Sequence, residues 1–378
     1  MSQRIGIVTG GGDCPGLNAV IRAVAKAAAK RGWETIGFLG GYEGILEPQQ
    51  YVQLDYQKLG SLLTRGGTIL GTANRGRFSA KVGHGESRRL PQELIDGVKA
   101  GMQRLSIRGL VSIGGDGSLS IGQQLFEGGV PLVGVPKTID NDLEGTVMTF
   151  GFDSAVACAT DALDRLHTTA ESHNRVMVLE VMGRYAGWIA LYAGVAGGAD
   201  VILIPEIPFT YESICGKIGQ REEAGKHFTL VIVAEGAREK GAEFVTAAAQ
   251  VANREARLGG IAAVVAAEVE KRTGKEARAC VLGHLQRGGS PTNFDRALCS
   301  IFGAEAVELI AAGKFGHMVA YQGSHVDAVK ITEAVGRPKK PCRPKEGSHA
   351  RPVPSGSAWV IDAPYGPLLQ EDRRRCNR

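Results

Sequence analysis

A single carboxylate among glycines marks the stretch IGGDGS, residues 113–118, which follows a short apolar run. The acid is Asp116, and no lysine lies beside it in the sequence. Mg²⁺ favours one or two carboxylates together with phosphate oxygens and water, so Asp116 is a candidate metal ligand. Gly117 and Ser118 leave room for the backbone to approach a phosphate. The alternative is an aspartate that caps the following helix.

A pair of acids follows in the stretch PKTIDND, residues 136–142. Residues two apart on an extended segment face the same side, so we expect Asp140 and Asp142 to lie together near Thr138 and Lys137. Two adjoining carboxylates are costly unless they meet a metal ion, a cation or a substrate proton. Transfer of a phosphoryl group to an alcohol needs a carboxylate that accepts the hydroxyl proton. A polar turn would explain the last two residues, but it explains Asp140 less well.

Two further glycine-rich stretches could hold phosphates. GGGDCPG, residues 10–16, lies between a predicted strand and a predicted helix, where backbone N–H groups can approach an anion. GGTILGTANRGR, residues 66–77, ends with Arg75 and Arg77, and two arginines can clamp the phosphates of a nucleotide. Tight turns and a solvated basic loop are the plainer interpretations. Cys14 lies within the first stretch, and its oxidation or alkylation is expected to inhibit phosphate binding there.

Cations are scattered through a body of nearly zero net charge. The whole chain carries +5, but residues 337–378 hold ten Lys/Arg and four Asp/Glu, which leaves 34 basic and 35 acidic residues elsewhere. The body is therefore not a nucleic-acid-binding surface, and its cations are better explained as local sites for anionic substrates. Arginines that hold a sugar phosphate would fit this pattern. The candidates, in the stretches SHNR, EVMGR, RAC and GHLQRGGSP, are Arg175, Arg184, Arg278, His284 and Arg287.

The elements that must position these residues are short strands alternating with helices. Residues 4–10 are predicted to form a buried strand, and residues 17–33 an amphipathic helix. Further apolar runs at 35–38, 110–113, 132–135, 176–181, 201–204 and 230–234 are typical of strands buried on both faces. This pattern predicts an α/β fold with two units that join near Gly151. Ligands in such sheets bind beyond the carboxyl ends of the strands, where Asp13, Asp116, Asp140 and Arg184 lie.

Several functional classes are disfavoured by composition. No apolar run is long enough to span a bilayer, and the N-terminal residues lack a signal-peptide pattern, so a cytoplasmic protein is expected. Seven cysteines stand singly, which suits reduced thiols and indicates neither a disulfide framework nor a zinc site. The proline-rich, basic residues 337–378 are predicted to be disordered or loosely attached.

Taken together, these stretches resemble the 6-phosphofructokinase family, in order and at similar separations from Arg4 to about Val319. The resemblance implies two interlocked Rossmann-like domains with mainly parallel sheets and the active site in the cleft between them. The larger, donor-binding domain would span residues 1–151 and about 287–320, and the smaller, sugar-phosphate-binding domain residues 152–286. It further implies that the chain phosphorylates O1 of fructose 6-phosphate in glycolysis, with Mg²⁺, as a homo-oligomer (a dimer or a tetramer).

The resemblance also implies a role for each matching residue. Asp140 matches the general base, Thr138 touches the transferring phosphoryl group, and Asp142 is a second acid that supports the metal or the base. Asp116 matches the Mg²⁺ ligand, and the residues expected around the donor are Gly12, Arg75, Gly115, Gly117, Ser118 and Lys137. The residues expected to hold the sugar are Met182, Gly183, Arg184 and Glu235, with His284 and Arg287 at its 6-phosphate. Arg175 and Arg278 match arginines that reach the 6-phosphate in a neighbouring subunit's site.

The phosphoryl donor depends on two positions of the resemblance. Family members that use pyrophosphate carry an acid where this chain has Gly117, and a carboxylate there would repel the α-phosphate of a nucleotide. The same members carry a lysine at the place of Lys137, where bacterial ATP-using members have glycine. An open space is the stronger condition, so ATP is the expected donor and pyrophosphate the alternative.

Two interpretations from other classes rank lower. A non-catalytic subunit that binds nucleotide or sugar phosphate would lack the acids, yet Asp116, Asp140 and Asp142 are all present. A dehydrogenase would need a G-x-G-x-x-G stretch after a strand, and the sequence has none.

Overall fold

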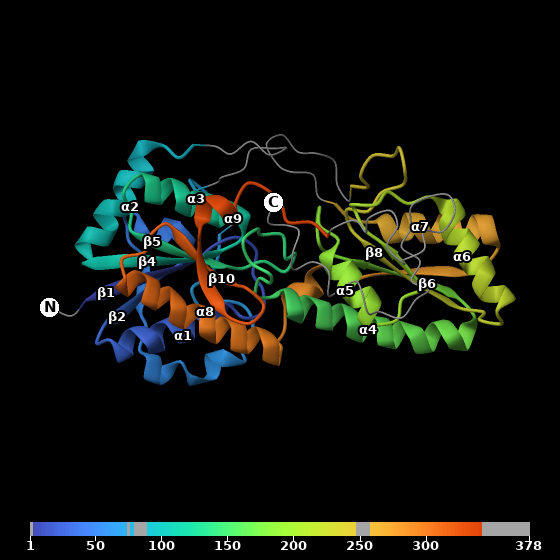
Figure 1. Cartoon of the computed structure of the whole chain (residues 1–378), viewed down its shortest axis with the longest axis horizontal. Coiled ribbons are helices and arrows are strands. Elements are labelled where there is room, and N and C mark those ends of the chain that lie inside the picture. The colour runs from blue at the N-terminus through green and yellow to red at the C-terminus, as the bar shows by residue number, and fades with distance from the viewer. Residues whose placement is uncertain (1–2, 74–75, 79–88, 247–257, 342–378) are drawn as a thin grey trace.

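Two β-sheets with helices packed on them lie side by side in the computed structural model, which describes residues 3–73, 76–78, 89–246 and 258–341 (Figure 1). The larger sheet has seven strands in the order β11-β10-β5-β4-β1-β2-β3, and the smaller has four in the order β7-β8-β6-β9. Strands pair in parallel except at the two edges of the larger sheet, where β11 and β3 are antiparallel to their neighbours. The predicted α/β fold with mainly parallel sheets is confirmed.

The elements alternate along the chain as the apolar runs predict. The strands are β1 (Arg4–Thr9), β2 (Glu34–Phe38), β3 (Tyr51–Gln53), β4 (Ile107–Gly114), β5 (Leu132–Pro136), β6 (Val176–Val181), β7 (Val201–Leu203), β8 (Thr229–Ala234), β9 (Ala277–Val281), β10 (His317–Tyr321) and β11 (Val326–Lys330). The α-helices are α1 (Leu17–Lys30), α2 (Gln92–Arg104), α3 (Asp116–Glu127), α4 (Phe152–His173), α5 (Trp188–Ala196), α6 (Tyr211–Glu223), α7 (Ile261–Thr273), α8 (Asn293–Ala311) and α9 (Ile331–Ala334). Short 3₁₀ helices are η1 (Gly41–Ile45), η2 (Tyr56–Lys58), η3 (Gly60–Leu63) and η4 (Gly283–Arg287).

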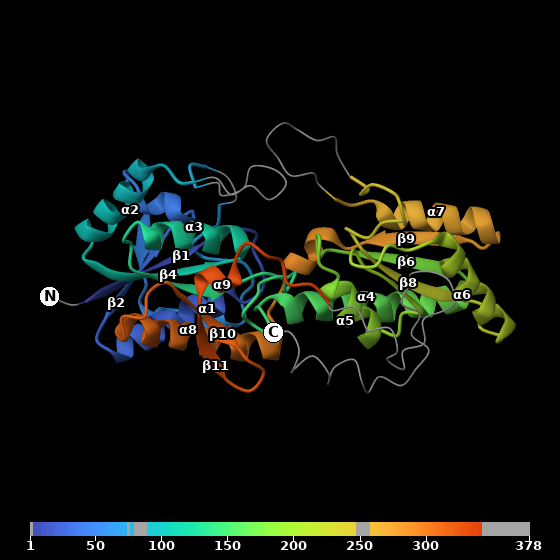
Figure 2. The same ribbon diagram turned by 45° about the horizontal axis from the view of Figure 1, so that its top comes forward.

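The chain passes from the larger sheet to the smaller one and then returns. It leaves the larger sheet after β5 and enters the smaller unit through α4, and after β9 it returns with α8, which packs against α1 (Figure 2). Asp295 of α8 fixes the first crossing, because its carboxylate accepts hydrogen bonds from the backbone N–H of Gly151 and from both the N–H and hydroxyl of Ser154. Asp295 is fully buried, so these three donors compensate its desolvation.

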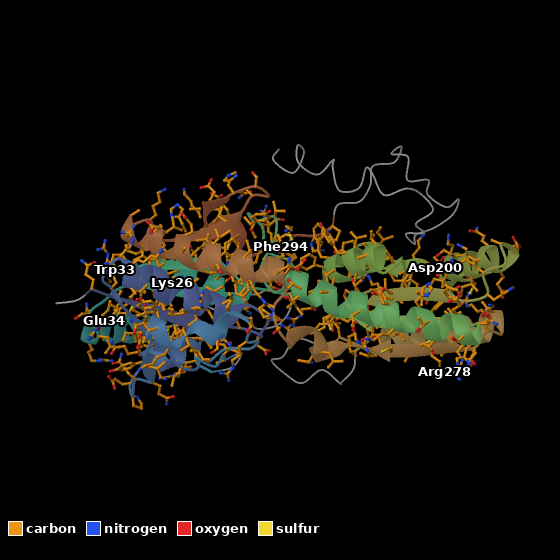
Figure 3. All side chains as sticks on the ribbon, turned by 90° about the horizontal axis from the view of Figure 1, so that it is seen from below. Lys26, Trp33, Glu34, Asp200, Arg278 and Phe294 are labelled. Atoms are coloured by element: carbon orange, nitrogen blue, oxygen red, sulfur yellow. The ribbon has the colours of Figure 1, made fainter. Side chains whose placement is uncertain are left out.

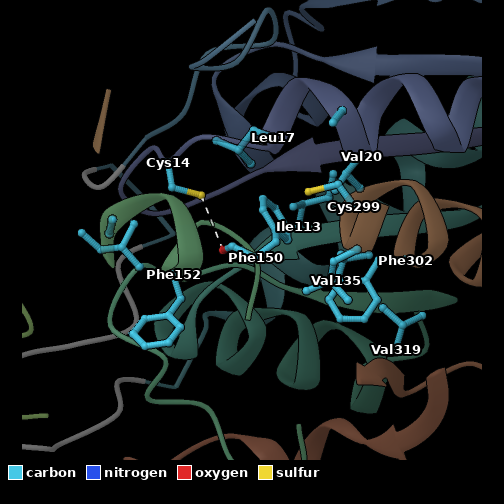
Figure 4. Packing of buried hydrophobic residues seen from close by; sticks show 14 of the residues in the cluster. Cys14, Leu17, Val20, Ile113, Val135, Phe150, Phe152, Cys299, Phe302 and Val319 are labelled. Carbon is cyan, nitrogen blue, oxygen red and sulfur yellow. Dashed lines mark hydrogen bonds between the residues drawn. The ribbon is translucent and has the colours of Figure 1, made fainter. Parts of the chain in front are cut away.

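A continuous apolar core lies beneath the first glycine stretch. Phe150, Phe302 and Cys299 are fully buried there together with Cys14, whose thiol donates to the Phe150 carbonyl at 3.8 Å (Figure 4). Burial raises the pKa of the Cys14 thiol to about 12. Thiolates are the reactive species, so the expected sensitivity of this loop to thiol reagents is not supported: Cys14 points into the core instead of toward a bound phosphate.

The carboxyl ends of both sheets face the space between the two units. In Figure 3, Trp33 and Glu34, next to the start of β2, lie at one end of the molecule, and Arg278, near the start of β9, lies toward the other. The loops that follow β1, β4, β5 and β6 therefore all point toward the middle, as parallel sheets require. Within the described part of the chain, no helix is both long and apolar enough to cross a membrane.

Candidate active site

The first two glycine stretches pack against each other at the end of β1. Gly10 forms a parallel bridge with Ala73, and the Thr72 hydroxyl donates to the Gly11 carbonyl at 2.6 Å. A Cβ on Gly12 would lie 2.7 Å from a guanidinium nitrogen of Arg287, so a side chain there would require the arginine to shift. Arg75, expected at the donor, lies outside the described residues.

Lys137 supports this loop from below. Its side chain is 3% exposed, and its ammonium group donates to the Gly12 carbonyl. Burial lowers the pKa of Lys137, with the charge of Arg287 acting in the same direction and those of Asp140 and Asp13 opposing it. The lysine is thus bound to the backbone of the glycine loop, which is a structural use that the sequence alone does not predict.

The third glycine stretch forms the start of α3. Gly115 is the N-cap residue, and Asp116 and Gly117 are the first two residues of the helix. A Cβ on Gly117 would meet nothing within 4 Å, whereas Ser118 is buried against Gly10 and Gly114. Residue 117 therefore faces open space, as expected for a position next to the donor.

Asp116 is the first residue of α3 and not its N-cap residue. One of its carboxylate oxygens accepts a hydrogen bond from the backbone N–H of Gly336 at 2.8 Å. Among the described residues, no group of three or more His, Cys, Asp or Glu side chains could enclose a metal ion. A lone carboxylate beside an open, glycine-lined space fits Mg²⁺, which takes most of its ligands from phosphate and water.

Asp140 lies in the stretch PKTIDND, four residues after the end of β5. Its Oδ1 atom is buried and has no hydrogen-bond partner among the described residues. Burial raises the pKa of Asp140 to about 7, helped by the negative charges of Asp142 and Glu235 and opposed by Arg287 and Arg184. A carboxyl group that titrates near neutrality and keeps one oxygen unpaired is suited to accept a proton.

The loop around Asp140 is not extended. The expectation that Asp140 and Asp142 face the same side of an extended segment is therefore wrong. Asn141 adopts a left-handed conformation with φ of 50°, and its side chain accepts from the Thr149 N–H at 3.0 Å and donates to the Val147 carbonyl at 3.3 Å. Asp142 nevertheless lies close enough to raise the pKa of Asp140. The asparagine shapes the turn, and the Thr138 hydroxyl accepts from the Asp140 N–H at 3.1 Å.

The expected sugar-binding residues lie at the ends of β6 and β8. Arg184 has φ of 50°, and its N–H donates to the Glu235 carboxylate at 3.1 Å. Burial raises the pKa of Glu235, although the Arg184 N–H and the charges of Arg184 and Arg287 oppose this. Met182 and Gly183 form the same turn, directly after β6.

Gln286 is a site residue that the sequence analysis missed. Its side chain is 1% exposed, accepts from the Met182 N–H at 2.7 Å and donates to the Ala155 carbonyl at 3.4 Å. Gln286 thus connects η4 to the turn after β6 and holds the backbone next to Arg287. The Arg287 guanidinium donates to the Asp13 carbonyl at 3.1 Å. The available signal in the sequence was the glutamine between His284 and Arg287 in the stretch GHLQRGG. His284 is exposed on the same 3₁₀ helix.

Charged side chains from both units act on the Asp140 carboxyl group. Charges of Arg184 and Glu235, from the smaller unit, act on Asp140 of the larger unit, and so does the charge of Arg287. Arg287 also contacts the glycine loop. Asp140, the glycine loop at residues 10–16 and the turn at residues 182–184, which we call the sugar loop after its expected role, therefore meet between the two sheets.

Arg175 and Arg278 lie elsewhere. Both arginines bind Glu276, Arg175 at 2.5 Å and Arg278 through its other oxygen. They flank the starts of β6 and β9, whereas Met182 follows the end of β6. Six residues of strand at about 3.3 Å each separate them from the sugar loop, roughly 20 Å.

Comparison with known proteins identifies the family. Residues 4–310 match the family described as Phosphofructokinase. The chain is 53% identical over 334 residues to the ATP-dependent 6-phosphofructokinase of Chloroflexus aggregans, which covers 88% of this chain and 91% of that protein.

The chain belongs to the phosphofructokinase family.

Other members of the phosphofructokinase family differ in the donor that their names record. The pyrophosphate–fructose 6-phosphate 1-phosphotransferase of Amycolatopsis methanolica is 47% identical over 339 residues, covering 89% of this chain and 96% of that protein. Among solved structures, the phosphofructokinase of Pichia pastoris in the T-state superposes with a TM-score of 0.75 at 30% identity, over 88% of this chain and 35% of that chain. The family expected from the motifs is confirmed.

Proposed function

We propose that this protein transfers the γ-phosphoryl group of ATP to O1 of fructose 6-phosphate. The observation that carries the proposal is Asp140, which has a pKa of about 7 and a buried carboxylate oxygen with no hydrogen-bond partner among the described residues. The 53% identical relative is named as an ATP-dependent 6-phosphofructokinase, which supports the same reaction here.

Asp140 in its ionised form accepts the proton of the sugar 1-hydroxyl as that oxygen attacks phosphorus. In this proposal Thr138, whose hydroxyl lies beside the Asp140 backbone, contacts the transferring group. Arg184 and Arg287 favour the ionised carboxylate and supply positive charge for the phosphates. Asp116 would hold Mg²⁺, which when bound would neutralise part of the negative charge on the donor.

Two features support ATP over pyrophosphate. The space at Gly117 is open, so the remainder of a nucleotide meets no side chain there. Lys137 is bound to the Gly12 carbonyl, and a lysine held in this way does not block the nucleotide. Pyrophosphate remains the second candidate, because the Amycolatopsis relative is named for it at 47% identity.

A coupled assay of fructose 1,6-bisphosphate formation tests the reaction, with ATP and pyrophosphate supplied separately. We expect activity with ATP and a loss of 10²- to 10⁴-fold in kcat for Asp140→Asn. The matched control is Asp164→Asn on the exposed face of α4, which should be fully active. Activity with pyrophosphate alone would overturn the donor, and an active Asp140→Asn variant would overturn the base.

We further propose that Arg175 and Arg278 complete the 6-phosphate site of a neighbouring subunit in a homo-oligomer. Their position about 20 Å from the sugar loop of their own chain supports this. So does the edge strand β9, where Val281 is 54% exposed. Mixing inactive Asp140→Asn with inactive Arg278→Ala protein should restore activity, because a mixed oligomer has sites with both residues intact. No recovery after reassembly would contradict the shared site.

A further inference from the structure

A short segment after α9, residues 336–341, crosses from the larger unit to α5 of the smaller one (Figure 2). The basic region predicted from Arg337 to be loosely attached starts within this segment, and residues 342–378 lie outside the described part. Lys339 is partly buried at its centre, and neighbouring Pro341 is buried. The segment therefore packs against the molecule beside the candidate active site.

Lys339 binds the loop that carries the proposed base. Its backbone N–H donates to the Asp142 carbonyl at 2.8 Å. Its ammonium group donates to the carbonyls of Thr146 at 2.9 Å and Val147 at 2.7 Å. The Val147 carbonyl also accepts from Asn141, so Lys339 and Asn141 hold the same turn from opposite sides.

The same lysine binds the smaller unit. Its carbonyl accepts a hydrogen bond from the indole N–H of Trp188 at 3.0 Å, and its ammonium group lies 5.4 Å from the centre of that ring. A cation over an indole is attracted to the ring face. Trp188 is the first residue of α5, four residues after Arg184 of the sugar loop.

The segment also contacts the third part of the site. The Gly336 N–H orients the carboxylate of Asp116, and Pro338 bridges to Leu143 in the acid loop. One stretch of four residues, 336–339, thus contacts the proposed metal ligand, the loop of the base and the helix that follows the sugar loop.

We propose that Lys339 is a positioning residue for phosphoryl transfer, which fixes the Asp140 loop relative to the sugar-binding unit through Trp188. The inference rests on the proposed function for its kinetic consequence, but the contacts themselves do not depend on it. Misplacing a reacting group by about 1 Å can cost on the order of 10²-fold in rate. Loss of the side chain leaves the backbone contacts of Lys339 in place, so the expected loss is smaller.

Steady-state kinetics on four full-length variants test the kinetic role. Lys339→Met removes the charge and its donors and should lower kcat about tenfold, while KM for fructose 6-phosphate and ATP changes less than about threefold. Lys339→Arg should recover most of the rate, since arginine keeps a cation over the ring and donors for the carbonyls. Trp188→Phe should fall between these two. Lys340→Met, the exposed neighbouring lysine, is the matched control and should match the wild type.

Two further measurements separate this proposal from the proposed function and from simple instability. Hydrogen exchange of the full chain should become faster in residues 139–149 and at the start of α5 in Lys339→Met, and unchanged in Lys340→Met. Hydrogen exchange does not require the enzyme to be active. An inactive wild type would therefore overturn the proposed function, while the exchange rates would still test whether Lys339 holds the Asp140 loop. Trp188→Phe removes the indole N–H that donates to the Lys339 carbonyl, a hydrogen bond that Lys339→Met leaves in place, so the double variant should lose more than either single variant. Unchanged exchange, or a kcat within about twofold of the wild type, in Lys339→Met would overturn the positioning role.

Discussion

Gly117 gives the sharpest test of donor choice, because the substitution Gly117→Asp is predicted to change folding and donor affinity in opposite directions. A Cβ at this position meets nothing within 4 Å, so the side chain fits without displacing a neighbour. Residue 117 lies in the first turn of α3, where an aspartate is favoured by the helix dipole and replaces a poor helix former. The variant should therefore be about 0.5 kcal/mol more stable, or unchanged.

The effect on ATP follows from charge. A carboxylate in the open space at residue 117 would repel the α-phosphate of a nucleotide bound on the glycine stretches. At an effective dielectric constant of about 20, two unit negative charges about 5 Å apart repel by about 3 kcal/mol. That energy corresponds to a loss of about 10²-fold in affinity. Pyrophosphate has no α-phosphate with an attached nucleoside, so its binding should be much less affected.

The assay compares kcat/KM for ATP and for pyrophosphate in the wild type, Gly117→Asp and Gly117→Ala, together with the melting temperature of each. Gly117→Ala controls for size and should change kcat/KM for ATP less than about threefold, since its methyl group has room. A Gly117→Asp variant that is fully folded and keeps kcat/KM for ATP within about threefold of the wild type would refute the charge argument.

Three other predictions concern titration, reactivity and stability. Asp140 has its pKa raised to about 7, and only its ionised form accepts a proton, so kcat should rise with pH through about 7. Asp142→Asn removes a negative charge that raises this pKa and should move the rise in the pH–rate profile to lower pH. A rise that does not move would be assigned to another group. Cys14 is fully buried with its pKa raised to about 12, so mass spectrometry after treatment of the native protein with iodoacetamide should find it unmodified, and labelling in the folded state would show that the loop opens. Asp295 accepts three hydrogen bonds that hold α4 to α8, so Asp295→Ala should lower the free energy of unfolding by about 3 kcal/mol in denaturant titration, whereas a change under about 1 kcal/mol would mean that water replaces the carboxylate.

The sequence by itself determined the features that depend on local pattern. Near-continuous apolar runs predicted β1, β4, β5, β6 and β8, because strands buried on both faces need apolar side chains throughout. The rule that parallel sheets bind ligands at the carboxyl ends of their strands then predicted Asp116 and Asp140 at that end of one sheet and Arg184 at that end of the other. The ordered motifs identified the family, and the comparisons confirmed it.

Only the tertiary structure decided how those residues are held and which of them lie together. The pKa of Asp140 depends on burial and on charges from both units, which are far apart in sequence. The hydrogen bond from Lys137 to the Gly12 carbonyl was not predicted from the sequence. Lys339 lies in a basic, proline-rich stretch without periodic pattern, yet it joins Asp142 to Trp188. Such contacts follow from how two sheets pack, and local sequence carries no record of that packing.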